Sequence, residues 1–284
     1  MIKTCLLGLG RTGMVVADAI LKAPQFELVS VISKPGGNKI GRPLSEYLPG
    51  AGELIIQDSQ DLESEIETTK FTVAIDFTSP AAALQNTKTL AKHGVNVVIG
   101  TTGFNNIQLF EIEKITEQAK IGLVYAPNIS VGINLLLSLV KTIARMIPHY
   151  DVDITESCHR HKQDAPSGTA LRIAEAIYKA KGEPRSPRLR RDQKGLQLRE
   201  KGEIGMHSIR AGGIVGVHQV LFAGESDEIE ITHRAYSRTV YADGALKAST
   251  FINGRRGFYH MEDVLGTPEG SASGILDRIR IHCN

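Results

Sequence analysis

The stretch that decides the fold lies at the N-terminus, where Ile2–Gly13 is I-K-T-C-L-L-G-L-G-R-T-G. A short apolar run is followed at once by glycines in the spacing G-x-G-x-x-G, and then by apolar residues at helical spacing. Strand, glycine turn and helix in this order are typical of dinucleotide binding. The first glycine permits a tight turn, the second lets the backbone approach a pyrophosphate, and the third lets helix and strand pack closely.

The candidate cofactor-binding residues of this turn are Gly8, Gly10, Arg11, Thr12, Gly13 and Met14. A domain that prefers NAD usually carries Asp or Glu at the end of its second strand, about 20 residues after the glycines. Here the expected second strand, 27–32, is followed by Ser33 and Lys34. A hydroxyl and an ammonium suit a 2′-phosphate, so the sequence favours NADPH, with NADH possible. The alternative is that Lys34 is only a surface lysine.

Strands and helices continue to alternate, which predicts a parallel sheet. Strands are expected at 71–77, 95–100 and 121–125, and helices near 59–66 and at 81–93. Ligands of open parallel sheets bind at the carboxyl ends of the strands. The segments that follow two of these strands are rich in Gly, Thr, Asn and Ser, although turn residues would close the strands in any case. Their residues are further cofactor-binding candidates: Gly100, Thr101, Thr102, Ala126, Pro127, Asn128 and Ile129.

The periodicity changes in the second half of the chain. After an apolar helix at 134–146 and a strand at 151–156, three strands follow one another at 204–211, 216–223 and 228–233 without helices between them. This change indicates an antiparallel α+β domain that begins near Ser130, and a helical pattern returns at 238–251. The predicted fold class is α/β, a Rossmann-type domain with a second α+β domain carrying a mixed or antiparallel sheet.

The stretch richest in reactive groups is Glu156–Ala170, E-S-C-H-R-H-K-Q-D-A-P-S-G-T-A. Ser167 is a good N-cap for the helix that the apolar spacing predicts after it. The backbone N–H groups of its first turn, with the positive end of the helix dipole, favour an anion. Lys162 could face the same anion. A solvated polar loop is the alternative interpretation.

Composition is that of an ordinary globular protein large enough for two domains, with 284 residues of which 42% are hydrophobic. A net charge of +2 gives no general attraction to nucleic acid or to an anionic membrane, and no apolar run approaches the length of about 20 residues that spans a bilayer. The cysteines, three in number and far apart, indicate neither a disulfide framework nor a metal site and fit a reducing cytoplasm. The basic cluster Arg185, Arg188, Arg190 and Arg191 is interpreted as a solvated loop.

The segment D-A-P-S-G-T-A, preceded by histidines and a lysine, closely resembles the signature of the dihydrodipicolinate reductase (4-hydroxy-tetrahydrodipicolinate reductase) family, E-x-H-H-x-x-K-x-D-A-P-S-G-T-A. The segments G-T-T-G-F, A-P-N-I-S-V-G-I-N and R-A-G-G-I-V-G-V-H also resemble that family. One departure falls on the chemistry. Cys158 stands where the family carries its first histidine, which is regarded as the proton donor.

The resemblance implies NAD(P)H-dependent reduction of a cyclic imine dicarboxylate, 4-hydroxy-tetrahydrodipicolinate, to tetrahydrodipicolinate in diaminopimelate and lysine biosynthesis. It makes Lys162 the catalytic lysine and assigns the dicarboxylate substrate to His159, Ser167, Gly168 and Thr169, while Arg238 is a further cofactor-binding candidate. The proton could come from Cys158, His159, His161, Lys162 or water. The resemblance also implies a discontinuous dinucleotide-binding domain, 1–129 with about 239–284, and a domain at 130–238 that binds substrate and forms a homotetramer.

Two other functions remain open at this stage. Because Cys158 replaces the usual donor, the chain could reduce a different cyclic imine or dicarboxylate. It could also be a nucleotide-binding protein without turnover, although such a protein has no evident need for Lys162 and a second anion site. A metal site formed by Cys158, His159 and His161 requires all three ligands to converge and is not expected. The expected partner is a small dicarboxylate, without nucleic acid or membrane.

Overall fold

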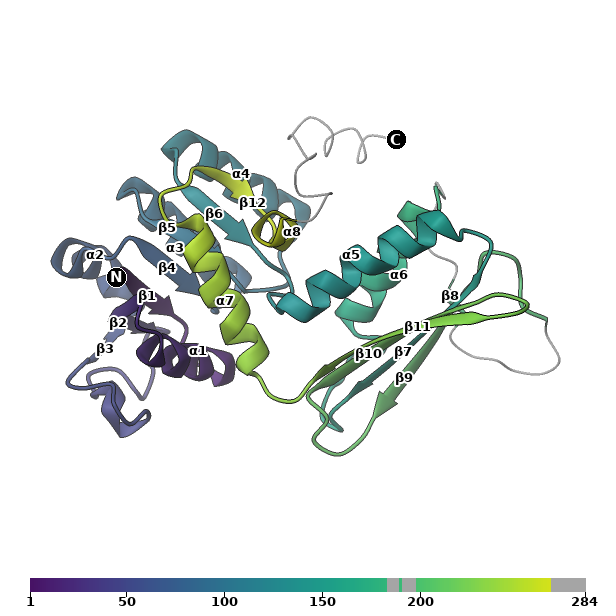
Figure 1. Ribbon diagram of the computed structural model, residues 1–284. Coiled ribbons are helices and arrows are strands. Elements are labelled where there is room, and N and C mark those ends of the chain that lie inside the picture. The colour runs from purple at the N-terminus through teal and green to yellow at the C-terminus, as the bar shows by residue number, and fades with distance from the viewer. Residues whose placement is uncertain (183–188, 191–197, 267–284) are drawn as a thin grey trace. The chain divides into compact units, whose positions relative to one another are not determined.

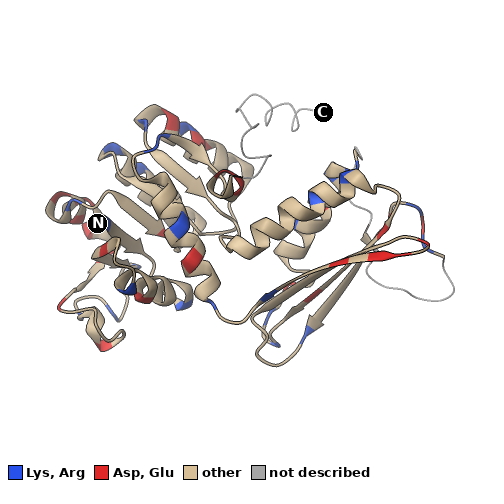
Figure 2. Cartoon of the chain, viewed as in Figure 1, with Lys and Arg blue, Asp and Glu red and all other residues tan. Residues whose placement is uncertain are grey.

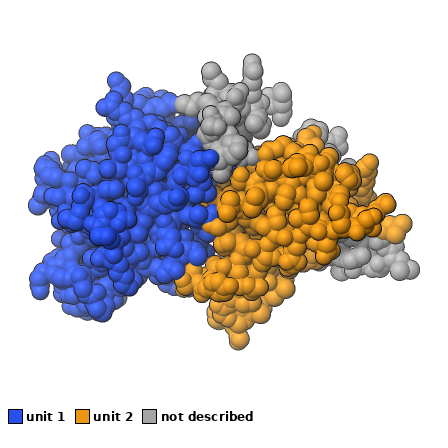
Figure 3. Space-filling model, viewed as in Figure 1, with its two compact units in different colours: residues 1–131, 239–284 blue, residues 132–238 orange. Residues whose placement is uncertain are grey.

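The computed structural model describes residues 1–182, 189–190 and 198–266 (Figure 1). The chain divides into two compact units, one formed by Met1–Val131 with Thr239–Asn284 and the other by Gly132–Arg238 (Figure 3). Three calls from the sequence concern residues outside the described ones: most of the basic loop (Arg185, Arg188, Arg191), Cys283, and the end of the expected first domain from 267 to 284.

A parallel sheet of seven strands forms the centre of the first unit, in the order β12-β6-β5-β4-β1-β2-β3 (Figure 1). The sheet order reverses between β1 and β4, the kind of switch point at which open parallel sheets bind ligands. This topology confirms the predicted Rossmann-type fold. The strands are β1 (Ile2–Leu7), β2 (Phe26–Ser33), β3 (Ile56–Asp58), β4 (Val73–Asp76), β5 (Asn96–Ile99), β6 (Gly122–Tyr125) and β12 (Gly257–Tyr259).

Helices cover both faces of this sheet, because neighbouring residues of each buried strand point to opposite sides. Leu6 packs with Val16 and Ala248 on one side, and Leu7 packs with Leu90 and Ile112 on the other. The helices are α1 (Arg11–Lys22), α2 (Leu62–Thr69), α3 (Pro80–Lys92), α4 (Asn106–Ala119), α7 (Thr239–Ile252) and α8 (Met261–Leu265), with short 3₁₀ turns η1 (Leu44–Glu46) and η2 (Ser59–Asp61).

The second unit contains two helices and a five-stranded sheet in the order β11-β10-β7-β9-β8 (Figure 1). Strand β7 pairs antiparallel with β10 and parallel with β9. The elements are α5 (Val131–Met146), β7 (Asp151–Cys158), α6 (Gly168–Ala180), β8 (Leu189–Arg190), β9 (Ile204–Arg210), β10 (Gly216–Ala223) and β11 (Glu228–Ala235).

This sheet is mixed, which agrees with the predicted second α+β domain with a mixed or antiparallel sheet. The reason lies in the connection between β7 and β9. It contains helix α6, and a crossover through a helix returns the chain to the same end of the sheet, so the next strand runs parallel. Strand β7 then separates β9 from β10, although these two strands are consecutive among the predicted ones.

Helices α5 and α6 cover one face of the second sheet. Their apolar residues pack on every second residue of the strands, so that Val152 and Ile154 of β7 contact a core that contains Leu137 of α5 and Ile173 of α6. The next residue of β7 on that face is Glu156. The covered face therefore changes from apolar to charged toward the end of the strand.

Candidate active site

The glycine turn after β1 has the backbone that its sequence predicts. Gly8 has a φ of +95°, and a Cβ there would lie 2.6 Å from the Phe77 carbonyl oxygen. A Cβ on Gly13 would lie 1.9 Å from the Gly8 carbonyl oxygen. The fold itself therefore requires these two glycines. A Cβ on Gly10 would meet no atom within 4 Å, so the start of α1 is open there to a phosphate group.

The other predicted cofactor residues of the first unit lie at the same carboxyl edge of the sheet. Ser33 is the last residue of β2 and Lys34 follows it, Gly100, Thr101 and Thr102 follow β5, and the 126–129 segment follows β6. Arg238 directly precedes α7 and is the last residue of the second unit. The edge thus gathers every predicted cofactor residue except Arg238.

Asp76, which sequence reasoning missed, joins two of the loops at this edge. Its carboxylate is 1% exposed and accepts hydrogen bonds from the Thr78 N–H (2.9 Å), the Thr78 hydroxyl (2.6 Å), the Thr101 hydroxyl (2.9 Å) and the Asn86 amide (2.8 Å). Burial raises the pKa of Asp76, against these hydrogen bonds. The Thr101 hydroxyl is therefore engaged by Asp76, and Thr101 has its backbone to offer a cofactor. The signal in the sequence was a lone Asp that ends the apolar run V-A-I-D.

A second residue that sequence reasoning missed is Lys39. Its ammonium donates to the Leu9 carbonyl inside the glycine turn (3.1 Å) and lies 5.1 Å from the centroid of the Tyr47 ring. Lys39 therefore adds a cation to the same turn as Arg11, in the loop that begins at Lys34. Elsewhere on the first unit, basic and acidic residues are interspersed in the view of Figure 2.

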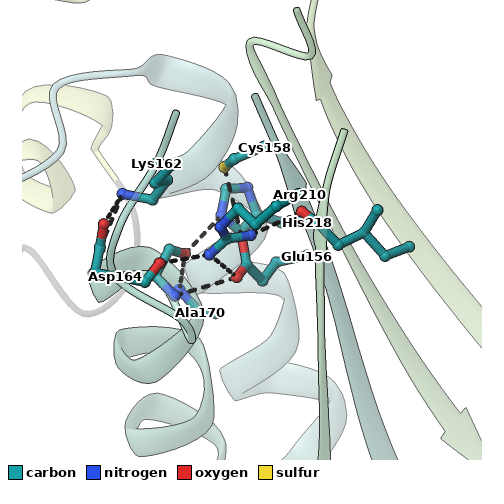
Figure 4. Close-up of polar contacts among 9 residues, drawn as sticks. Glu156, Cys158, Lys162, Asp164, Ala170, Arg210 and His218 are labelled. Carbon is teal, nitrogen blue, oxygen red and sulfur yellow. Dashed lines mark hydrogen bonds and ion pairs between the residues drawn. The ribbon is translucent and has the colours of Figure 1, made fainter. Parts of the chain in front are cut away.

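The second unit has a candidate site of its own, at the end of β7 and in the segment that follows it (Figure 4). The strand continues to Cys158, two residues beyond its expected end, so Glu156 and Cys158 are not part of a solvated loop. Glu156 is 0% exposed and Cys158 is 5% exposed. Both continue the inward-facing positions of Val152 and Ile154.

Glu156 is the centre of the polar contacts in Figure 4. Its Oε1 accepts from Nη2 of Arg210 (2.5 Å) and from the Ser167 N–H (3.3 Å), and its Oε2 accepts from the Cys158 thiol (3.6 Å). Burial alone would raise the pKa of Glu156, but hydrogen bonds from Arg210 and Ser208, the Arg210 charge and the Ser167 N–H lower it. Glu156 is therefore an ionised, buried carboxylate.

The start of α6 confirms the predicted cap. The Ser167 hydroxyl accepts from the Ala170 N–H (3.2 Å), and Gly168 and Thr169 form the first turn. His218 lies against this cap, with its Nε2 3.5 Å from the Ser167 hydroxyl. Burial lowers the pKa of His218 to about 4, so the ring is neutral at physiological pH.

Lys162 lies in the loop between β7 and α6, where its ammonium is 2.7 Å from Oδ1 of Asp164. A hydrogen bond from Lys162 lowers the pKa of Asp164, and the Gly168 N–H contributes to the same effect. Lys162 and the first turn of α6 thus meet on one carboxylate. Nη2 of Arg210 also donates to the Asp164 carbonyl oxygen (2.6 Å).

The histidines and the thiol of this loop have different surroundings. The rings of His159 and His161 are 6.3 Å apart, and Nδ1 of His159 is buried without a hydrogen-bond partner in the described part of the chain. Burial, followed by the Glu156 charge, raises the pKa of Cys158. The thiol therefore keeps its proton and directs it at Glu156. No group of three or more His, Cys, Asp or Glu residues with metal-site geometry occurs among the described residues.

Two features define the class of protein. The first unit has a Rossmann-type sheet with an open glycine turn at its switch point. In the second unit, a lysine and the N-terminus of a helix both contact one carboxylate. The class is that of two-domain, pyridine-nucleotide-dependent oxidoreductases with an acidic substrate.

Comparisons with known proteins specify the family. Residues 2–129 match the family described as "Dihydrodipicolinate reductase, N-terminus", and residues 132–265 match "Dihydrodipicolinate reductase, C-terminus". The chain is 40% identical over 259 residues to the 4-hydroxy-tetrahydrodipicolinate reductase of Ralstonia nicotianae, covering 90% of this chain and 96% of that protein. It is 42% identical over 260 residues to the enzyme of the same name from Psychrobacter arcticus, covering 90% and 92%.

The chain therefore belongs to the dihydrodipicolinate reductase family, as the sequence predicted, and it is an NAD(P)H-dependent oxidoreductase.

The fold is also similar to that of a solved structure, the dipicolinate-bound dihydrodipicolinate reductase from Paenisporosarcina sp. TG-14. The TM-score is 0.74 and the sequence identity is 28%, covering 92% of this chain and 97% of that one. These relatives support the main predicted function, reduction of 4-hydroxy-tetrahydrodipicolinate, and none of them favours either alternative. In the described part of the chain, no helix has the length and apolar character needed to cross a membrane.

Proposed function

We propose that the chain reduces 4-hydroxy-tetrahydrodipicolinate to tetrahydrodipicolinate and that the second unit recognises the substrate by its carboxylates. The observation that carries this proposal is the carboxylate of Asp164, which contacts both Lys162 and the Gly168 N–H. An ammonium and a helix N-terminus that hold one carboxylate of the chain suit a carboxylate of the substrate. The Asp164 side chain is 56% exposed, so it can turn to solvent when a substrate carboxylate takes its place beside Lys162.

The cofactor belongs to the carboxyl edge of the first sheet. The glycine turn and Arg11 to Met14 would hold its pyrophosphate, because the space at Gly10 admits a phosphate that a side chain there would exclude. The loops at 100–102 and 126–129, with Arg238, would hold the nicotinamide half. When bound, the reduced nicotinamide supplies the hydride. We favour NADPH over NADH, since Lys34 and Lys39 provide cations for a 2′-phosphate.

Lys162 carries the chemical step in this proposal. Its ammonium binds the anionic substrate, stabilises the charge that develops as hydride arrives, and has a proton to give to the neighbouring carbon. His159 contributes a substrate contact, and Ser167, Gly168 and Thr169 form the carboxylate cradle. Cys158 is not assigned the donor role, because its buried thiol is directed at Glu156.

We further propose a homotetramer in a reducing cytoplasm. The face of the second sheet opposite α5 and α6 carries Ile209, which is 46% exposed, and is suited to contacts between subunits. The described cysteines Cys5 and Cys158 are free thiols, which a reducing compartment preserves. Sedimentation velocity of the purified protein tests the oligomeric state.

The test of the proposed function is NADPH oxidation, with the substrate generated in situ by the upstream synthase. We expect turnover in the wild type, a loss of kcat/KM of roughly 100-fold or more in Lys162→Ala, and little change in Lys179→Ala. Lys179 is a suitable control because it lies on α6 in an exposed pair with Glu175. An inactive wild type that gains activity in Cys158→His would contradict the proposal and indicate another substrate.

A further inference from the structure

The inference concerns Glu156, a charged residue at a position where the sheet pattern calls for an apolar one. Its partners on the neighbouring strands are Ser208 of β9 and His218 of β10, and His218 in turn faces His233 of β11. A polar row therefore crosses four strands directly beyond the apolar rows of the core. An uncompensated buried carboxylate is costly, so the hydrogen bonds of Glu156 must offset its burial.

Those hydrogen bonds join three separate parts of the chain. The Ser167 N–H fixes the start of α6, Arg210 comes from the end of β9, and the Cys158 thiol comes from β7 itself (Figure 4). These contacts connect segments that are distant in the sequence, because Arg210 is 54 residues from Glu156 and Ser167 is 11 residues from it.

Arg210 extends the join to the loop that carries Lys162. Its Nη2 contacts both Glu156 and the Asp164 carbonyl oxygen, and its side chain is 17% exposed. Asp164 is the residue whose carboxylate lies against Lys162. One buried carboxylate and one guanidinium therefore determine where the Lys162 loop and the start of α6 lie relative to each other.

We propose that Glu156 and Arg210 are positioning residues that set the spacing between Lys162 and the α6 cradle, and hence the recognition of a dicarboxylate. This inference rests on the proposed function. Neither residue is assigned a contact with the substrate; both act through Ser167 and the backbone of Asp164. A rigid support of this kind is what a charged ligand site needs to hold its groups in place.

The test uses the full-length protein with bound NADPH and titrates dipicolinate by calorimetry. Glu156→Gln preserves the size of the side chain and removes its charge, and we expect roughly a tenfold rise in the Kd for dipicolinate and in the substrate KM. The Kd for NADPH should stay within about twofold, because the first unit binds it. The matched control is Asp153→Asn. Asp153 lies on the same strand, β7, and this substitution breaks its ion pair with Arg199.

A second variant protects the test against a folding defect. Arg210→Lys keeps a charge beside Glu156 but cannot reproduce the two contacts of the guanidinium, so we expect a smaller rise in the dipicolinate Kd at an unchanged thermal midpoint. The inference is overturned if both variants bind dipicolinate as Asp153→Asn does, or if the affinities for dipicolinate and NADPH fall together with the thermal midpoint. An inactive wild type would instead remove the proposed function on which the inference rests, and activity that survives in Lys162→Ala would remove only the role assigned to Lys162.

Discussion

The Thr101 hydroxyl donates to the Asp76 carboxylate across 2.9 Å, and this bond joins the loop after β5 to the turn after β4. Both segments lie at the edge where the cofactor is expected. Asp76 also receives the Asn86 amide of α3, so a single buried side chain fixes three segments. The charge of Asp76 has no cation among the contacts described for it, and hydrogen bonds alone compensate for its burial.

Replacing Asp76 with Ala should therefore destabilise the first unit. The change removes the acceptor of the Thr78 N–H and of the buried Asn86 amide, and we expect a loss of about 2–3 kcal/mol in the free energy of unfolding. The Kd for NADPH should rise as well, because the Thr101 loop loses its anchor. Urea denaturation and cofactor titration check both effects. Asp18→Ala, which removes an exposed pair with Lys22, should change stability by less than about 0.5 kcal/mol.

Substitutions at two glycines of the turn after β1 should affect cofactor binding and folding separately. Gly10→Ala adds a methyl group to open space, so the thermal midpoint should change little while the affinity for NADPH falls, because the methyl group occupies the path of the pyrophosphate. Gly13→Ala drives a methyl group into the Gly8 carbonyl and should lower the thermal midpoint strongly. Equal affinity for NADPH in Gly10→Ala and wild type would place the pyrophosphate elsewhere.

Local patterns explain why much of this site was predictable. The spacing of Gly8, Gly10 and Gly13 and the cap at Ser167 are set by residues a few positions apart, and the structure has both features. Helix α4 was missed although Asn105 and Gln108 form a capping box at its start. Strand β3 has only three residues, too few for a periodic pattern.

Long-range pairing explains what the sequence did not show. The contact between Glu156 and Arg210 depends on β9 lying beside β7, and the order of strands in the second sheet cannot be obtained from hydrophobic periodicity. The same holds for Asp76 and Thr101, which are 25 residues apart. Cys158 looked like part of a polar loop because Glu156 and the histidines surround it in sequence, yet its strand position buries it.

The lysines of the loop after β2 should determine cofactor preference. Lys34→Ala and Lys39→Ala should each raise the Kd for NADPH roughly tenfold and leave the Kd for NADH unchanged. The reason is that only NADPH has a 2′-phosphate, which loses a charged partner in either variant. Fluorescence titration with the two cofactors measures the ratio. Lys22→Ala, at the far end of α1, serves as the control. Parallel losses for NADPH and NADH in Lys39→Ala would show that Lys39 only supports the turn through its contact with Leu9.

The pH dependence of stability should carry a contribution from His218. Burial lowers its pKa from 6.5 to about 4, so between these values the unfolded chain binds a proton that the folded chain does not. Stability is therefore lost as pH falls from about 6.5 to about 4, by an amount on the order of 3 kcal/mol for this residue. Burial lowers the pKa of His233 too, which adds a pH dependence of stability of the same sign.

Urea denaturation measures this contribution as the difference in the free energy of unfolding between pH 7.0 and pH 5.0. The difference should be smaller in His218→Gln than in wild type or in the control His149→Gln, which replaces an exposed histidine. An equal difference in all three proteins would mean that His218 binds a proton equally well in the folded and the unfolded chain at pH 5.0, and the lowered pKa of the buried ring would then be wrong.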